Sequence, residues 1–154
     1  MKKFSSLTNT RVFQDTEELS TSIKHTNVRA IQITPGPFRA MLAQRCLADW
    51  SIQHVAFAEG RSACAGDTSK DRHSFVVPLW RVPGARLLGR QVTADSFGVY
   101  APGSEHADVA IAGYGKAIAI PPPGFVSTLV GAGLESDIVR AGAHHVEAGS
   151  QSLE

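Results

Sequence analysis

Apolar and polar residues alternate along many short stretches of this chain, which is the pattern of half-buried β-strands. The stretch from Val28 to Thr34 shows it first, and Pro35-Gly36-Pro37 ends that run abruptly. Each comparable run is bounded by Gly, Pro, Asp or Ser, and the predicted strands cover residues 28–34, 38–47, 50–58, 73–80, 85–92, 97–100, 108–112 and 116–120. So many short, punctuated strands predict an antiparallel barrel or sandwich.

Two tight turns are predicted within this pattern. The segment from Leu87 to Val92 is typical of a hairpin, with Gly89 and Arg90 at or near its tip. Gly113-Tyr114-Gly115 is expected to join the last two strands in the same way.

Helical signals flank the strands. Asp15 is a good N-cap, Glu18 follows three residues later, and Leu19 and Ile23 are four apart, so a short helix is predicted over residues 16–24. Three prolines precede residues 125–130 and glycines follow them, which favours a second short helix, and one further helical turn is possible over residues 135–140.

These patterns divide the chain into three parts. Residues 1–12 lack a hydrophobic period and are predicted to be a flexible arm. Residues 13–133 form the folded domain, and residues 134–154 read as the start of a linker.

Composition narrows the class of protein. Fifteen Lys and Arg against fourteen Asp and Glu give a net charge of +1 without any basic run, so this chain itself is not expected to bind nucleic acid or an anionic membrane. No apolar run approaches the roughly 20 residues that span a bilayer. Cys46 and Cys64 are the only cysteines, and we expect reduced, buried thiols in a cytoplasmic protein.

The familiar catalytic motifs do not occur, so no catalytic residue is assigned and the chain is predicted not to be an enzyme. Six histidines suggest a metal site, but none of them forms an HxH pair, and no metal or other cofactor is expected. A barrel can instead enclose a small ligand between alternating side chains. The candidate ligand-binding residues are Arg39, Trp50, His54, Trp80, Tyr100 and His106.

The segment from Asp95 to His106 resembles the second motif of the cupin superfamily. An acidic turn residue, a short apolar strand, the turn Pro102-Gly103 and a histidine follow one another in that order. The first cupin motif, with its HxH pair and glutamate, has no counterpart, so the resemblance implies a cupin-like barrel without metal.

Taken together, the chain resembles the N-terminal sensing domain of AraC-type transcriptional regulators. The acidic helix from Asp15 to Ile23, the segment from Ile33 to Ala40, the Gly89 hairpin and the segment from Val99 to Glu105 carry the resemblance. It covers roughly Phe13 to Leu129 and implies a cupin-like jelly roll with a short N-terminal helix and one or two short C-terminal helices.

The resemblance also implies a function. Such a domain binds a small effector or forms a homodimer, and a helix-turn-helix half, expected to lie outside this chain, binds DNA. Phe125 and Leu129 are the candidate dimer contacts. A stand-alone cupin that binds a small molecule, or a metal-dependent cupin enzyme, is the alternative.

Overall fold

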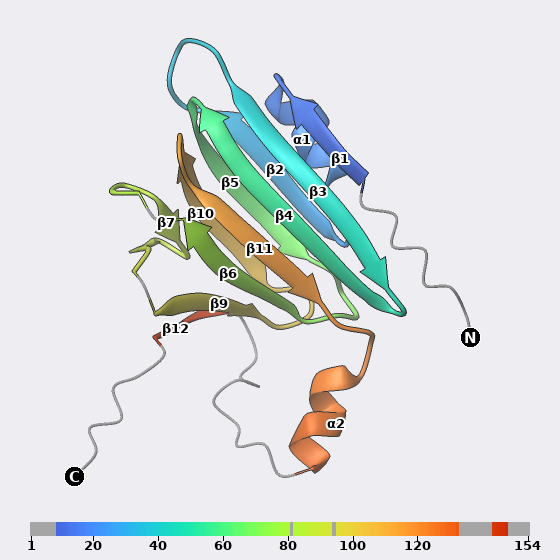
Figure 1. Cartoon of the computed structure of the whole chain (residues 1–154). Coiled ribbons are helices and arrows are strands. Elements are labelled where there is room, and N and C mark those ends of the chain that lie inside the picture. Colours follow the sequence, from blue (N-terminus) through green and yellow to red (C-terminus); the bar gives the residue numbers. More distant parts are fainter. Residues whose placement is uncertain (1–8, 81, 94, 133–142, 148–154) are drawn as a thin grey trace, which may run out of the picture.

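The alternating segments form two antiparallel sheets in the computed structural model, which describes residues 9–80, 82–93, 95–132 and 143–147 (Figure 1). The seven-stranded sheet has the order β1-β3-β4-β11-β6-β9-β12, and the five-stranded sheet has the order β2-β5-β10-β7-β8. The strands are β1 (Asn9–Phe13), β2 (Thr26–Gln32), β3 (Arg39–Leu47), β4 (Trp50–Glu59), β5 (Arg61–Thr68), β6 (Ser74–Trp80), β7 (Arg86–Leu87), β8 (Arg90–Gln91), β9 (Ser96–Tyr100), β10 (Glu105–Ile111), β11 (Gly115–Ile120) and β12 (Ala143–Glu147). The predicted mainly β, jelly-roll-like fold is therefore confirmed.

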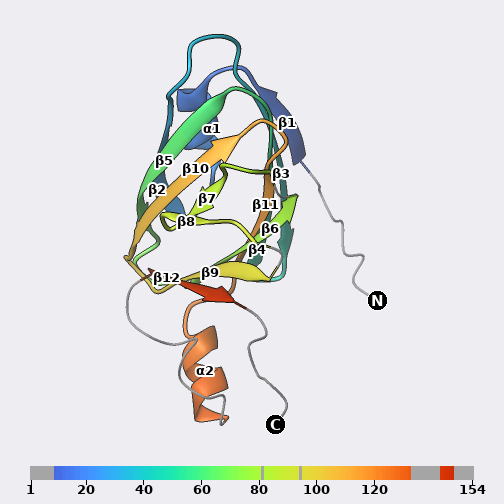
Figure 2. The ribbon, with the colours of Figure 1, turned by 90° about the vertical axis from the view of Figure 1, so that its left-hand side faces the viewer.

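The core lies between the two sheets, as the edge-on view shows (Figure 2). In β4, Ser51, Gln53, Val55 and Phe57 are buried, whereas the residues between them are only partly covered. This alternation places every second side chain of a strand in the interior. The largest fully buried side chains include Tyr100, Tyr114, Phe13, Leu19, Leu42, Leu87 and Ile120.

Both predicted helices are present. Helix α1 (Thr16–Ser22) begins at Asp15, whose Oδ1 accepts hydrogen bonds from the backbone N–H groups of Glu17 (2.8 Å) and Glu18 (2.9 Å). It lies beside β1 and β2, and Leu19 reaches the core. Helix α2 (Phe125–Gly131) extends beyond the end of the sandwich (Figure 2). Neither helix of the described residues is long and apolar enough to cross a membrane.

Strands β1 and β12 lie in segments that were not predicted to form strands. Residues 9–12, assigned to the flexible arm, lie in β1 and pair with β3, so that boundary was wrong; residues 1–8 lie outside the described residues. Within the predicted linker, 143–147 form β12 beside β9, while the possible helical turn over 135–140 falls outside the described part.

Strand β5 was missed because its side chains are small and weakly hydrophobic. It lies between β2 and β10, where space is short. A Cβ added to Gly66 would come 2.1 Å from the carbonyl oxygen of Asn27, so this position excludes larger residues. The same close packing removes the hydrophobic signal that identifies the other strands.

The predicted hairpin tip, with Gly89 and Arg90 at or near it, is confirmed. Leu87 pairs with Arg90, which leaves Leu88 and Gly89 in the turn, with φ values of 52° and 75°. Two consecutive positive φ angles define a type I′ turn, whose twist suits a hairpin. The tip is therefore Leu88-Gly89, and Arg90 already belongs to β8. The predicted turn at residues 113–115 lies between β10 and β11, as expected.

The connection between β3 and β4 gives a first prediction. Leu47 pairs with Trp50, and exposed Ala48 in the turn between them has a left-handed φ of 51°. Because a Cβ is strained there, Ala48→Gly should raise the free energy of unfolding by about 1 kcal/mol in urea unfolding. Ala65→Gly, at an exposed position inside β5, is the control and should lower it by roughly 0.5–1 kcal/mol. An equal decrease in the free energy of unfolding for both variants would contradict the left-handed conformation of Ala48.

Candidate functional site

An interior cavity lies between the two sheets and α1. The cavity has a volume of about 20 Å³, which is enough for a water molecule or a group of that size. Its wall is largely apolar, with polar side chains from the middle strands of both sheets. The lining residues are Leu19, Ser20, Ile23, Thr26, Val28, Ala30, Val55, Phe57, Cys64, Thr68, Ser74, Val76, Tyr100, His106, Lys116 and Ile118.

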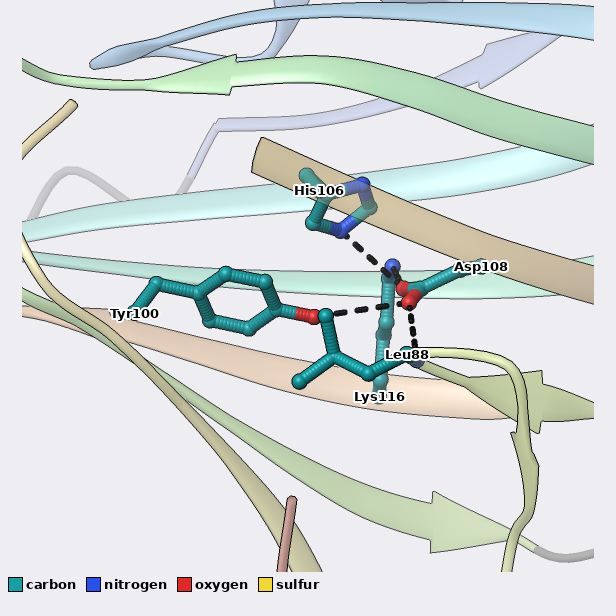
Figure 3. Close-up of polar contacts among 5 residues, drawn as sticks. All are labelled: Leu88, Tyr100, His106, Asp108 and Lys116. Atoms are coloured by element: carbon teal, nitrogen blue, oxygen red, sulfur yellow. Dashed lines mark hydrogen bonds and ion pairs between the residues drawn. The ribbon is translucent and has the colours of Figure 1, made fainter. Parts of the chain in front are cut away.

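A buried carboxylate organises the polar part of this wall (Figure 3). Oδ2 of Asp108 lies 2.5 Å from Nζ of Lys116 and 3.0 Å from Nε2 of His106. Its Oδ1 accepts hydrogen bonds from the backbone N–H of Leu88 (3.3 Å) and from the hydroxyl of Tyr100 (3.4 Å). All of these donors converge on one group, so the carboxylate is satisfied without water.

Burial and charge act against each other in this cluster. Burial alone raises the pKa of Asp108, but Lys116 and His106 outweigh burial and hold that pKa below its ordinary value. For Lys116, burial lowers the pKa, and the attraction of Asp108 outweighs it and raises that pKa. Asp108 and Lys116 are therefore both charged at neutral pH, and they balance one another inside the fold.

Several buried polar atoms beside the cluster have no hydrogen-bond partner. They include Nδ1 of His106, Oγ of Ser74 and Oγ1 of Thr26, and all three residues line the cavity. Ser74 is only 2% exposed and His106 only 7%. A buried polar group without a partner costs about 1–3 kcal/mol, so these atoms mark where a bound molecule would gain hydrogen bonds.

Two of the six predicted ligand-binding residues line the cavity. Tyr100, from β9, and His106, from β10, stack on each other with ring centroids 5.2 Å apart. Both side chains therefore border the cavity, and their ligand-binding role stays a prediction.

The other four predicted residues lie outside the cavity, which corrects their placement. Arg39 is exposed and pairs with Glu59 at 2.8 Å. His54 lies against Trp80, with centroids 5.0 Å apart, and Trp80 is 50% exposed. Trp50 packs edge-on against Phe125, with centroids 4.8 Å apart.

Strand parity explains the misplacement. In β4, Trp50 and His54 alternate with the inward-facing Gln53 and Val55, so they point away from the core. Trp80 reaches the same outer face because Gly115 has no side chain: a Cβ there would lie 2.0 Å from the indole ring. Large aromatic residues on the outer face look like core residues in the sequence.

Asp108 and Lys116 are the site residues that the sequence analysis missed. Lys116 shares its strand parity with the buried Ile118 and Ile120, and Asp108 shares its parity with His106 and Ala110. A charged residue at an inward position of a strand was the available signal, since a buried charge requires a partner.

The remaining predicted residues have the following surroundings. Phe125 and Leu129 are both partly buried in α2, and their role as dimer contacts is a prediction. Cys64 is buried as expected, but Cys46 is exposed, which corrects its assignment. Among the described residues, no group of three or more His, Cys, Asp or Glu side chains is placed to hold a metal ion.

Comparison with known proteins found a structural neighbour. No protein-family model and no curated protein matches the chain. In structure, the chain is similar to the AraC-like transcriptional activator CuxR. The TM-score is 0.48 and the sequence identity 13%, and the match covers 80% of this chain and 51% of the other. The chain thus spans about half the length of that protein.

The two tyrosines of the chain provide a test of the buried cluster. Burial raises the pKa of Tyr114 to about 12 and, together with the negative charge of Asp108, raises that of Tyr100 further. Because tyrosine in an unfolded chain ionises at about pH 10, the native protein should show only a small fraction of the full tyrosinate absorbance at about pH 11. Both pKa values are raised by folding, so this contribution to stability is complete below about pH 10 and is lost as the pH rises toward the folded values.

The control is the same titration in concentrated urea, where both tyrosines should ionise at about pH 10. A tyrosinate signal at that pH from a protein whose fold is intact would contradict the burial of Tyr100 or Tyr114.

Proposed function

We propose that this chain is a small-molecule-binding domain, the effector-sensing domain of a transcriptional regulator of the AraC type. The observation that carries the proposal is the set of partnerless polar atoms on His106 and Ser74, buried at the wall of an otherwise apolar cavity. A few convergent polar groups on an apolar wall are typical of small-ligand sites. The resemblance of the sequence adds the regulatory context, in which a separate helix-turn-helix domain contacts DNA.

Binding would work through a population shift. The cavity is nearly filled by the chain's own side chains, so a ligand larger than water binds only when the wall moves outward. The closed and opened forms then have different affinities for the effector, which is what a ligand needs to change an equilibrium between two states. Leu19 and Ser20 of α1 and the C-cap residue Ile23 belong to this wall, and their side chains are the ones that would move.

The alternative, a metal-dependent cupin enzyme, is less compatible with the charges present. The ammonium group of Lys116 lies 2.5 Å from Asp108, where a divalent cation would need the carboxylate. His106 directs Nε2 at the same oxygen, Oδ2. A positive side chain in that place repels a metal ion, so the proposal includes no catalytic step.

The proposal is tested by removing the partnerless hydroxyl. Ser74→Ala should leave the free energy of unfolding unchanged or raise it by about 1 kcal/mol, because a buried hydroxyl without a partner is removed. Thr68→Ala is the matched control: the Thr68 hydroxyl donates to the carbonyl oxygen of Ala101 at 3.0 Å, and its loss should cost about 1 kcal/mol. Urea unfolding of both variants gives the comparison.

A thermal-shift screen of small organic compounds completes this test. At least one class should raise the unfolding midpoint of the wild type and raise that of Ser74→Ala less. Equal destabilisation by Ser74→Ala and Thr68→Ala, with no stabilising compound, would show that Ser74 has a structural role and would overturn the proposal.

We further propose that α2 contributes to a homodimer through Leu129. Phe125 is engaged with Trp50 inside the chain, whereas Leu129 is a partly buried apolar residue of the same helix. Leu129→Glu should halve the mass measured by light scattering, since a charge would be buried in the contact. Thr128→Glu, at an exposed neighbouring position, should leave the mass unchanged. A monomeric wild type would contradict this contact.

A further inference from the structure

The interior cavity and a surface groove share a wall that is one layer of side chains thick. The groove runs between α1 and β2 and measures about 380 Å³. Ser20, Ile23, Thr26 and Val28 line both the groove and the cavity. Outward movement of these side chains would connect the cavity with the groove.

The backbone on both sides of Ile23 is held in place, because Nε2 of Gln44 donates to the carbonyl oxygen of Ser22 (2.8 Å) and the N–H of Lys24 donates to Oε1 of Gln53 (2.9 Å). Helix α1 has seven residues, and Leu19 is the one that is fully buried. Ile23 stands at the C-terminal cap of the helix, is only partly buried and packs at the margin of the core. A rotation of the Ile23 side chain therefore requires no break in either sheet, and Ile23 is one of the residues that separate the groove from the cavity.

The chemistry at the inner end limits what can bind. Nε2 of His106 donates to the Asp108 carboxylate, so in the neutral ring Nδ1 is an acceptor, and this nitrogen is the one without a partner. A molecule that offers an O–H or N–H group satisfies it. The charge of Asp108 is already balanced by Lys116, so a carboxylate or ammonium group on the ligand would enter without a free counter-charge.

The outer end faces different surroundings. Glu17 and Arg29 are exposed at the groove, where a polar or charged group stays in contact with water. The inner space admits only a narrow group, whereas the groove is much larger. Shape and polarity thus favour an elongated molecule that enters with a slender end.

We propose that the groove and the cavity form one binding site for an elongated molecule, whose slender, uncharged end passes Ile23 and donates a hydrogen bond to Nδ1 of His106. This inference rests on the proposed function and adds the entry route and the chemical class of the ligand. Its outer part occupies the groove beside α1.

The test uses three probes that each contain a six-carbon chain: 1-hexanol, hexanoate and 1-methoxyhexane. Binding is followed by amide chemical shifts in nuclear magnetic resonance spectra of the full chain. We expect 1-hexanol to bind saturably, with shifts around Ile23 and His106. The ether lacks a donor and should bind about tenfold more weakly, the change that a lost hydrogen bond produces. Hexanoate would bring an unpaired charge into the interior and should bind more weakly than the ether. Equal binding of all three would overturn the proposed chemistry.

Variants at the wall test the route. Ile23→Trp should block the passage and weaken 1-hexanol binding by about tenfold or more, while Ile23→Ala should strengthen it. Ile31→Trp is the matched control, because Ile31 belongs to β2 but is 54% exposed on its outer side. Each variant's spectrum shows whether it is folded, and Ile23→Ala keeps the test decisive if the tryptophan variant is not.

The outcomes separate this inference from the proposed function. Unchanged 1-hexanol binding in both Ile23 variants would overturn the route and leave interior binding intact. If a compound from the thermal-shift screen binds and 1-hexanol does not, the proposed ligand class is wrong and the sensing function stands. If neither binds, both proposals fail.

Discussion

The buried carboxylate of Asp108 is the interaction on which the interior of this protein depends. Its partners come from β9, β10, β11 and the turn between β7 and β8, so one group connects both sheets and the hairpin between them. Removing one member of a buried ion pair leaves an unpaired charge in a low-dielectric interior, at a cost of about 3–5 kcal/mol. Lys116 and Asp108 therefore constrain each other, and the strands that carry them have to keep their register.

This arrangement also limits the polar groups that the cavity offers to a ligand. Because the cluster neutralises itself, its remaining hydrogen-bonding capacity is limited to atoms at its margin, above all Nδ1 of His106 and Oγ of Ser74. The surrounding side chains, such as Val55, Val76 and Ile118, provide apolar contact without direction. In the proposed binding mode, a ligand would be selected by one or two polar contacts and by its fit past the residues that line both the cavity and the groove.

The outer surface of the seven-stranded sheet explains how sequence reasoning chose the wrong side. Trp50, His54 and Trp80 are large and partly covered by one another or by α2, so they have the composition of a core without being inside it. When both faces of a strand carry apolar residues, alternation identifies a strand but not the direction of its core. Tyr100 and His106 line the cavity: His106 alternates with exposed neighbours in β10, whereas in β9 Gly98, Val99 and Tyr100 are all buried.

Local structure follows from the amino-acid sequence: the N-cap at Asp15, the prolines that end the strand from Val28 and the glycine that permits the turn at Leu88-Gly89 all act within a few residues. Tertiary structure alone decided the site. Asp108 and Lys116 are eight residues apart in adjacent parts of the chain, yet β10 and β11 belong to different sheets, and only the packing of those sheets makes the two side chains partners. The edge strand β1 and the small-residue strand β5 were likewise decided by pairing with neighbours, because hydrogen bonds between strands depend on backbone geometry and available space more than on local hydrophobicity.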